Sequence, residues 1–271
     1  MTEWFSSLNY LRAFSSEIHR ALILSLSGGS FQRYTSILFS TLCAAYGDDI
    51  LCEVVSSNPL LERPIKTCKR FLQAMNKLSG RGLAISGASI LYAIEKAENI
   101  LKTYGKKPFI ILCDCFSLPE YIYLYDKFRD KTRPDKLLYA INPGGKTRTF
   151  EHLAKTYLFI SSEEVTLNML AEALKTRLGA AGYLLYREID AFVHGTGQAG
   201  FPNLMDIAFS LYRLVEELAL KVEQLLDRYC ILIMSDHGYD IYSKDDKWYL
   251  THRFNYGRHN LSIFSAAILI G

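Results

Sequence analysis

Apolar residues in the first hundred positions recur every three or four residues, the spacing that lines up side chains on one face of a helix. Turns rich in glycine, serine and proline interrupt this pattern. It predicts four helices: Leu8 to Leu26, Tyr34 to Tyr46, Leu60 to Leu78 and Ser89 to Tyr104. The segment from Ile50 to Ser56 fits a short strand equally well. We therefore predict a helical N-terminal domain over residues 1–106.

Beyond Pro108 the chain alternates between short apolar runs and amphipathic helices. The predicted strands are Phe109 to Cys113, Leu137 to Ile141, Tyr157 to Ile160, Gly182 to Tyr186, Cys230 to Met234 and Leu261 to Ile270. The predicted helices are Glu120 to Arg129, Phe150 to Lys155, Val165 to Leu178 and Leu204 to Tyr229. Strands that are apolar throughout and separated by helices are typical of a parallel sheet covered on both faces. The sequence thus predicts an α/β domain over residues 107–271, with a mainly parallel sheet flanked by helices.

Ionisable side chains follow three of these predicted strands. Asp114 comes directly after the strand that begins at Phe109, and Asp236 and His237 follow the strand that begins at Cys230. A third strand leads to Asp190, with His194 four residues further on. Functional groups of open α/β sheets collect beyond the carboxyl ends of the strands. We therefore expect these side chains to gather at one edge of the sheet.

A carboxylate at the end of a buried strand is costly unless a cation or hydrogen bonds neutralise it. A single one would be explained as well by a helix cap or an ion pair as by a metal. Three carboxylates together with histidines favour a shared cation, and Asp combined with His suits zinc. Asp236 and His237 would point to opposite faces of an extended strand. They can serve one site only if the chain turns, and Gly238 is the residue that we expect to permit the turn.

Composition narrows the class of protein. The chain has 271 residues, of which 49% are hydrophobic and 22% charged, and its net charge of +3 alone gives no reason to expect nucleic-acid binding. No apolar run reaches the roughly 20 residues that a membrane span needs, and the N-terminus lacks the pattern of a secretion signal. The six cysteines show no CxxC spacing. We interpret them as reduced, mostly buried thiols of a cytoplasmic protein without a membrane partner.

The motifs at the strand ends resemble, in order and interval, the metal motifs of the alkaline phosphatase superfamily, particularly its PglZ-type and nucleotide phosphodiesterase members. The resemblance covers Lys107 to Gly271. It rests on the aspartate after the first strand, the Asp-x-x-x-His pair, the Ser-Asp-His-Gly motif and a late histidine: Asp114, Asp190, His194, Ser235, Asp236, His237, Gly238 and His259. Ser-Asp-His-Gly after a strand is the most specific of these motifs.

The resemblance implies a threonine or serine nucleophile between Asp114 and Asp190. The segment NPGGKTRTF, residues 142–150, is similar to a stretch of the phosphodiesterases whose second threonine is the nucleophile. We therefore assign Thr149, with Thr147 as the substitute. A threonine at a helix N-cap also lies among unpaired backbone N–H groups that favour a bound phosphoryl group, although Thr149 could simply cap the helix. Lys146 and Arg148 are candidates for substrate binding, or they are solvated loop charges.

The last metal ligand is one of two histidines. The segment from Gly257 to Ser262 resembles the late family motif that leads into the final strand, which favours His259 over His252. By the family geometry, one divalent ion is held by Asp190, His194 and His259. The other is held by Asp114, Thr149, Asp236 and His237. The implied cofactors are two divalent metal ions, with zinc favoured and manganese as the alternative.

The other features have ordinary structural interpretations. The paired glycines near residues 28 and 80 end helices rather than forming a phosphate-binding loop, because neither follows a clear strand. His19 and His152 are expected in surface or capping roles. The helix from Leu204 is expected to pack onto the sheet rather than form a dimer seam.

The sequence therefore predicts a metal-dependent phosphoester hydrolase, with a phosphodiesterase of nucleotide or nucleic-acid-type substrates favoured and a role in phage defence or signalling. Hydrolysis of phosphomonoesters, sulfate esters or phosphonates on the same core is one alternative. A phosphomutase is another. A third is a non-catalytic metal-binding subunit whose N-terminal helical domain docks protein partners.

Overall fold

The computed structural model describes residues 13–14, 16–18, 20–21, 26, 28–47, 52–53, 55, 58–79, 90–133, 135, 137–142, 144–148, 150, 155, 158, 160–161, 165–252 and 261–271. Within them, five strands form one sheet in the order β2-β7-β4-β1-β3. Their bounds are β1 Pro108–Cys113, β2 Leu137–Ile141, β3 Gly182–Tyr186, β4 Cys230–Ser235 and β7 Phe264–Ile270. The predicted strand 157–160 falls mainly outside the described residues.

The sheet is mixed, which corrects the prediction of a mainly parallel sheet. β1 pairs in parallel with both β3 and β4, as expected. β7 runs antiparallel to both of its neighbours, β4 and β2. A parallel pairing would require the chain to cross to the other end of the sheet. After β4 the chain instead re-enters the sheet at the edge where β4 ends, since Met234 pairs with Ala267 near the start of β7.

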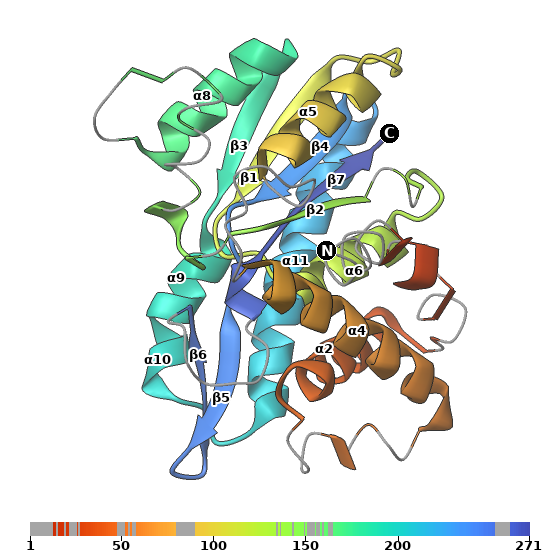
Figure 1. The fold of residues 1–271 in the computed structure, drawn as a ribbon, viewed down its shortest axis with the longest axis vertical. Coiled ribbons are helices and arrows are strands. Elements are labelled where there is room, and N and C mark those ends of the chain that lie inside the picture. Colours follow the sequence, from red (N-terminus) through yellow and green to blue (C-terminus); the bar gives the residue numbers. More distant parts are fainter. Residues whose placement is uncertain are drawn as a thin grey trace.

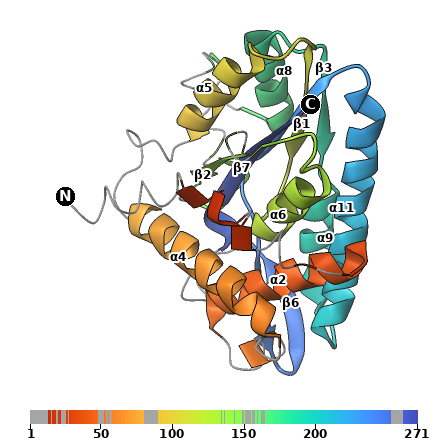
Figure 2. The same ribbon diagram turned by 90° about the vertical axis from the view of Figure 1, so that its right-hand side faces the viewer.

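Helices cover both faces of the sheet (Figure 1, Figure 2). Their bounds are α2 Ser30–Tyr46, α4 Glu62–Ser79, α5 Ile90–Leu101, α6 Leu118–Lys127, α8 Leu167–Leu178, α9 Glu188–His194, α10 Thr196–Ala199 and α11 Leu204–Leu226. Ile111 and Cys113 of β1 belong to the same core as α2, α4, α6 and α11. Ile110 and Leu112 belong to a second core with α5 and α8. Burial on both faces explains why β1 is apolar at every position.

The helix predicted from Leu204 is α11, and it packs onto the sheet through one face. Leu211, Val215, Leu218 and Val222 are all buried, at the spacing of one helical face. Its first turn is capped by Asn203, whose side chain accepts a hydrogen bond from the Asp206 N–H at 3.1 Å. The cap fixes where the helix begins.

The helices of the N-terminal part pack against the same core as the sheet. Tyr34 of α2 donates a hydrogen bond of 2.5 Å to the buried carboxylate of Glu120 in α6. Glu120 also accepts a hydrogen bond of 2.6 Å from Tyr239, close to the end of β4. A second link joins Tyr46 to Asp240 at 3.0 Å. Contacts from α2 thus support the segment that follows β4. The domain boundary after residue 106 remains a prediction.

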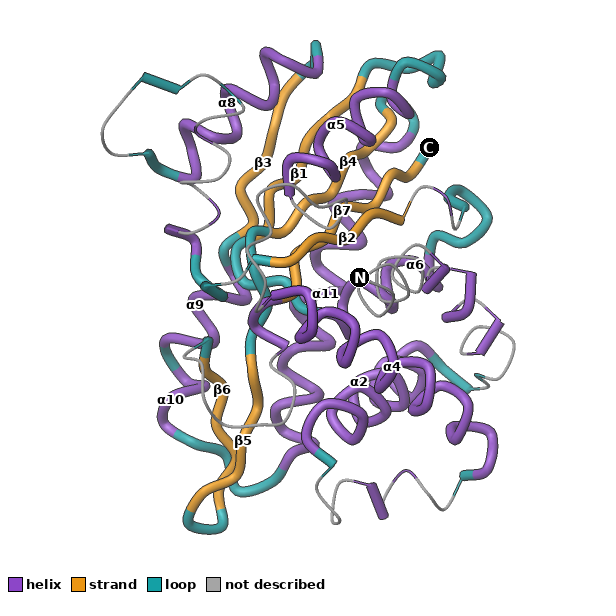
Figure 3. Tube along the Cα trace, viewed as in Figure 1, coloured by secondary structure: helices purple, strands orange, loops and turns teal. Residues whose placement is uncertain are grey.

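Two features of the C-terminal half were missed by the sequence patterns. Short helices α9 and α10 follow β3. A two-stranded sheet forms between β4 and β7 from β5, Asp240–Lys244, and β6, Lys247–Thr251. Figure 3 shows this hairpin projecting away from the main sheet. β6 packs against α9 and α10, and its Trp248 exchanges two backbone hydrogen bonds of 2.7 and 2.8 Å with Phe201.

The prediction that all cysteines are reduced is wrong for one pair. Cys43 and Cys52 form a disulfide, with Cα atoms 5.0 Å apart. Their separation of nine residues matches no short cysteine motif, so only the three-dimensional proximity reveals the pair. The other four cysteines are free and buried, as predicted: Cys68, Cys113, Cys115 and Cys230. Among the described residues, none of the helices has both the length and the apolar character required to cross a membrane.

Candidate metal centre

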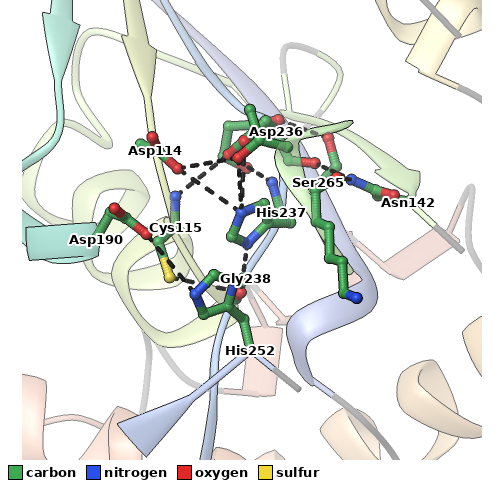
Figure 4. A network of polar contacts seen from close by, with 12 residues as sticks. Asp114, Cys115, Asn142, Asp190, Asp236, His237, Gly238, His252 and Ser265 are labelled. Atoms are coloured by element: carbon green, nitrogen blue, oxygen red, sulfur yellow. Dashed lines mark hydrogen bonds and ion pairs between the residues drawn. The ribbon is translucent and has the colours of Figure 1, made fainter. Parts of the chain in front are cut away.

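Two groups of potential metal ligands lie at the carboxyl edge of β1, β3 and β4 (Figure 4). We call Asp114, Asp236 and His237 the inner group, because all three residues are buried. Asp190, His194 and His252 form the outer group, which is partly exposed. Within each group the ligand atoms all lie within 4.8 Å of one another. The sequence prediction that separate strand ends converge is confirmed for the five predicted ligands that the structure describes.

The inner group is assembled by the backbone pairing of the three strands. The Asp114 N–H donates to the Tyr186 carbonyl at 2.8 Å, which continues the β1–β3 ladder, and the Asp236 N–H donates to the Cys113 carbonyl at 3.4 Å. The Nε2 atom of His237 then lies 3.7 Å from Asp114 Oδ1 and 3.5 Å from Asp236 Oδ2. Parallel pairing therefore brings both aspartates to one imidazole.

Asp236 has one satisfied and one unsatisfied carboxylate oxygen. Its Oδ1 accepts hydrogen bonds from the backbone N–H groups of His237 at 2.8 Å and Cys115 at 3.2 Å. Its Oδ2 is buried and has no hydrogen-bond partner among the described residues. A buried carboxylate oxygen without a partner is costly. A cation between Oδ2 and the His237 imidazole would remove that cost, so the inner group fits a divalent metal ion.

A hydrogen bond on the Nδ1 side of the ring fixes the orientation of His237. Its Nδ1 lies 2.8 Å from the Gly238 carbonyl oxygen and donates to it, which leaves the Nε2 lone pair facing the two aspartates. The prediction that Gly238 permits a special backbone turn needs correction, because its φ is not positive. Glycine is required there by close approach: a Cβ would lie 2.5 Å from the Leu261 carbonyl oxygen and 2.7 Å from Ser117 Oγ.

The outer group joins α9 to the end of the hairpin. Asp190 and His194 are four residues apart on α9, and His194 Nε2 lies 3.4 Å from Asp190 Oδ1. His252 directly follows β6, and its Nε2 lies 2.7 Å from the Nε2 of His194 and 3.9 Å from Asp190 Oδ1. Two imidazoles and one carboxylate form a donor set typical of zinc. The packing of β6 against α9 is what brings these ligands together.

The two groups are neighbours. The imidazole of His252 stacks on that of His237, with ring centroids 5.0 Å apart, and meets His194 edge-on at 4.5 Å. The His237 side chain is fully buried, whereas the His194 side chain is 52% exposed. Solvent and ligands therefore reach the outer group first, and the inner group lies behind it.

Electrostatics in the absence of a cation are unfavourable. Burial, followed by the charges of Asp236 and Asp190, raises the pKa of the Asp114 carboxyl to about 7. Burial also raises the pKa of Asp190, although His194 and His237 oppose this effect. Clustered carboxylates with raised pKa values are a common mark of a functional site. Bound cations would stabilise their ionised forms.

The segment that carries the predicted nucleophile is described in part. Thr149 lies outside the described residues, so its assignment stays a prediction. Thr147, the substitute, has its Oγ1 at 3.2 Å from His237 Nε2 and 3.5 Å from Asp114 Oδ1. The substrate-binding candidates Lys146 and Arg148 are exposed on either side of it. The described contacts therefore favour Thr147 as the hydroxyl of the inner group.

Asn142 holds this segment in place, a role that the sequence patterns did not identify. Its buried Nδ2 donates hydrogen bonds of 2.9 Å to the carbonyl oxygens of Lys146 and Asp236. It thus ties the threonine segment to the backbone of an inner ligand. The sequence feature that could have identified Asn142 is its position directly after β2, at the same edge of the sheet as the aspartates.

His259, the predicted last ligand, also lies outside the described residues and stays a prediction. His252, the alternative candidate for the last ligand, completes the outer group. Comparison of the chain with models of protein families finds no match, and comparison with curated proteins finds none either. The alkaline phosphatase resemblance is thus carried by its motifs alone.

Proposed function

We propose that this protein is a two-metal phosphoester hydrolase related to the alkaline phosphatase superfamily. The observation that carries the proposal is the pair of adjacent ligand groups, joined by the stacked imidazoles of His237 and His252. Such pairing is the arrangement expected of a site that binds two cations close together. Divalent ions in these groups would supply Lewis-acid stabilisation of the charge on a phosphoryl group.

The donor sets support different roles for the two groups. The outer group offers two imidazoles and one carboxylate, a set that zinc prefers. The inner group offers two carboxylates and one imidazole, with the Thr147 hydroxyl beside them. Its larger share of oxygen ligands would also suit manganese. Both metals named by the sequence analysis are compatible with this proposal.

Thr147 and Thr149 are the candidate nucleophiles. The threonine oxygen would attack phosphorus and give up its proton to a group of the site, and the ester oxygen would take up a proton and leave as the alcohol. Water would then hydrolyse the phosphothreonine, which restores the threonine hydroxyl and releases a phosphomonoester from a diester or inorganic phosphate from a monoester. The contacts of Thr147 with Asp114 and His237 support it as the attacking group. A free hydroxyl needs such activation, because it is a poor nucleophile near neutral pH. Thr149 remains the alternative implied by the family resemblance.

The proposed substrates are phosphodiesters of the nucleotide type, with phosphomonoesters and sulfate esters as the competing classes. Metal analysis of the purified chain, combined with parallel assays of the three ester classes before and after chelation, tests the proposal. We expect about two divalent ions per chain and turnover that chelation removes and added zinc or manganese restores. Full activity in a metal-free protein would refute the proposal.

A further inference from the structure

A pocket of about 320 Å³ opens between α9, α10 and α11. Phe192 of α9 lines it, and the outer ligands Asp190 and His194 lie two positions before and after Phe192 on the same helix. Two positions rotate a helical side chain by about 200°, so the pocket and the outer group lie on opposite faces of α9. The volume is at the lower end of the roughly 300–1,000 Å³ typical of small-molecule sites. The pocket is therefore a second candidate binding site, separate from the metal centre.

Aromatic rings form the apolar walls of this pocket. The ring centroids of Phe192 and Phe201 lie 5.7 Å apart, and two backbone hydrogen bonds to Trp248 fix the position of Phe201. Leu214 and Phe209, both of α11, also line the pocket. The side chain of Phe209 is a large apolar group, yet the residue is 52% exposed. An apolar ligand group in the pocket would remove this surface from water, which favours binding.

Two opposite charges on α11 line the same pocket. Arg213 and Glu217 are one helical turn apart, and both are exposed. The neighbouring Glu216 pairs with Lys127 at 2.8 Å. In contrast, the side chains of Arg213 and Glu217 form no ion pair or hydrogen bond with each other or with any other described residue. The pocket thus offers one cation and one anion to a ligand.

This pair of charges restricts the class of ligand. An apolar carboxylate would be attracted by Arg213 but repelled by Glu217, and an apolar amine would experience the reverse. A peptide terminus carries only one of the two complementary charges. A free α-amino acid carries an ammonium and a carboxylate group on one carbon atom. It can therefore neutralise both side chains of α11 while its own side chain contacts the aromatic walls.

We propose that this pocket binds a free α-amino acid with an aromatic or large aliphatic side chain. Arg213 binds the carboxylate of the ligand, and Glu217 accepts hydrogen bonds from its ammonium group. Phe192, Phe201 and Phe209 contact its side chain. The inference does not depend on the proposed function, because it uses none of the metal ligands. It adds a small-molecule site to the helix that carries two of those ligands.

An NMR titration of the purified full chain with L-phenylalanine tests this inference. Phenylacetate and phenethylamine are the comparators, since each lacks one of the two charged groups. We expect one phenylalanine to bind per chain, with a Kd in the roughly millimolar range for a ligand of this size. Each comparator should bind roughly threefold to tenfold more weakly, because charged contacts at exposed side chains contribute modestly. Absence of saturation at about 20 mM phenylalanine, well above that range, would overturn the inference.

Side-chain variants assign the individual contacts. Arg213→Gln should weaken the binding of phenylalanine but not of phenethylamine, and Glu217→Gln should weaken the binding of phenylalanine but not of phenylacetate. Phe209→Ala should weaken all three roughly twofold to tenfold, as loss of an aromatic contact implies. Glu223→Gln, at an exposed position of α11 outside the pocket, is the control and should change none of the affinities. Equal phenylalanine affinity in the parent, Arg213→Gln and Glu217→Gln proteins would show that these charges do not select the ligand, which overturns the inference.

Discussion

The Nε2 atoms of His194 and His252 lie 2.7 Å apart, although 58 positions separate the two residues in the sequence. Two neutral imidazoles cannot point lone pairs at each other at this distance without repulsion. One proton shared between them, or a cation bound by both, relieves the repulsion. Asp190, 3.4 Å from His194, adds a negative charge that favours either solution. This contact makes the outer group the most direct target for testing the metal centre.

We expect His252→Ala to remove the outer ion and to leave the inner ion bound. Loss of a residue that hydrogen-bonds to a metal ligand costs roughly tenfold to a hundredfold in metal affinity, and loss of a ligand itself should cost more. Metal analysis after dialysis against a weak chelator measures the stoichiometry. His259→Ala is the matched comparison. Loss of the outer ion in His259→Ala, with full retention in His252→Ala, would show that His259 and not His252 is the third ligand of the outer ion.

The choice between Thr147 and Thr149 is open to an equally direct comparison. We expect Thr147→Ala to lower kcat by roughly a thousandfold or more while both ions stay bound, because removal of a nucleophile typically has an effect of that order or larger. Thr147→Ser should retain turnover, since it keeps the hydroxyl. Initial rates at saturating substrate and metal content are the two measurements. A large loss of kcat in Thr149→Ala, together with full activity in Thr147→Ala, would show that Thr149 is the nucleophile.

Stability of the metal-free protein should fall as the pH rises. The pKa of Asp114 is raised in the folded chain, from an ordinary value of 3.8 to about 7, first by burial and then by Asp236 and Asp190. A carboxyl group whose pKa is raised on folding costs stability once it ionises. The cost therefore grows as the pH increases from about 4 to about 7 and is complete above that range.

Thermal unfolding of the chelated protein between pH 5 and 8 measures this effect. We expect the midpoint to fall with rising pH, and Asp114→Asn to flatten that dependence. Adding zinc at pH 8 should restore the midpoint of the parent protein, because the ion stabilises the ionised ligands. An identical pH dependence in the parent and Asp114→Asn proteins would show that Asp114 titrates normally.

The sequence identified the parts of the site that lie on strands apolar throughout. Asp114 and Asp236 were found because burial on both faces of β1 and β4 leaves an apolar pattern that ends abruptly in a charged residue. Asp190 was found through its position shortly after β3 and its spacing of four residues from His194. The direction of β7 was not predicted. The apolar pattern of a buried strand is the same whichever way the strand runs. The return of the chain to the same edge of the sheet depends on the hairpin between β4 and β7.

The position of His252 could not be predicted from the sequence, for a different reason. It depends on β6 packing against α9, and β5 and β6 are short, with several polar residues. Their turn, Asp245-Asp246, also lacks the glycine that usually marks a hairpin. His252 is placed by tertiary contacts, which local spacing does not encode.

The hairpin turn itself yields a prediction about stability. Lys244 pairs with Lys247, so only Asp245 and Asp246 form the loop, and both have positive φ angles of 51° and 56°. Such two-residue turns favour glycine at the second position, because a side chain there strains the backbone. We expect Asp246→Gly to raise the free energy of unfolding by about 0.5–1 kcal/mol.

Asp246→Ala is the matched control for this change. It removes the same charge but keeps the Cβ atom, so it should give no gain, and the two variants separate backbone strain from electrostatics. Denaturant titrations at a single pH, compared at equal slope, measure the difference. The turn lies at the opposite end of β6 from His252, which directly follows Thr251. Relief of strain in the turn should therefore leave the metal stoichiometry unchanged. Equal stability of the Gly and Ala variants would mean that the turn is not strained by the side chain of Asp246.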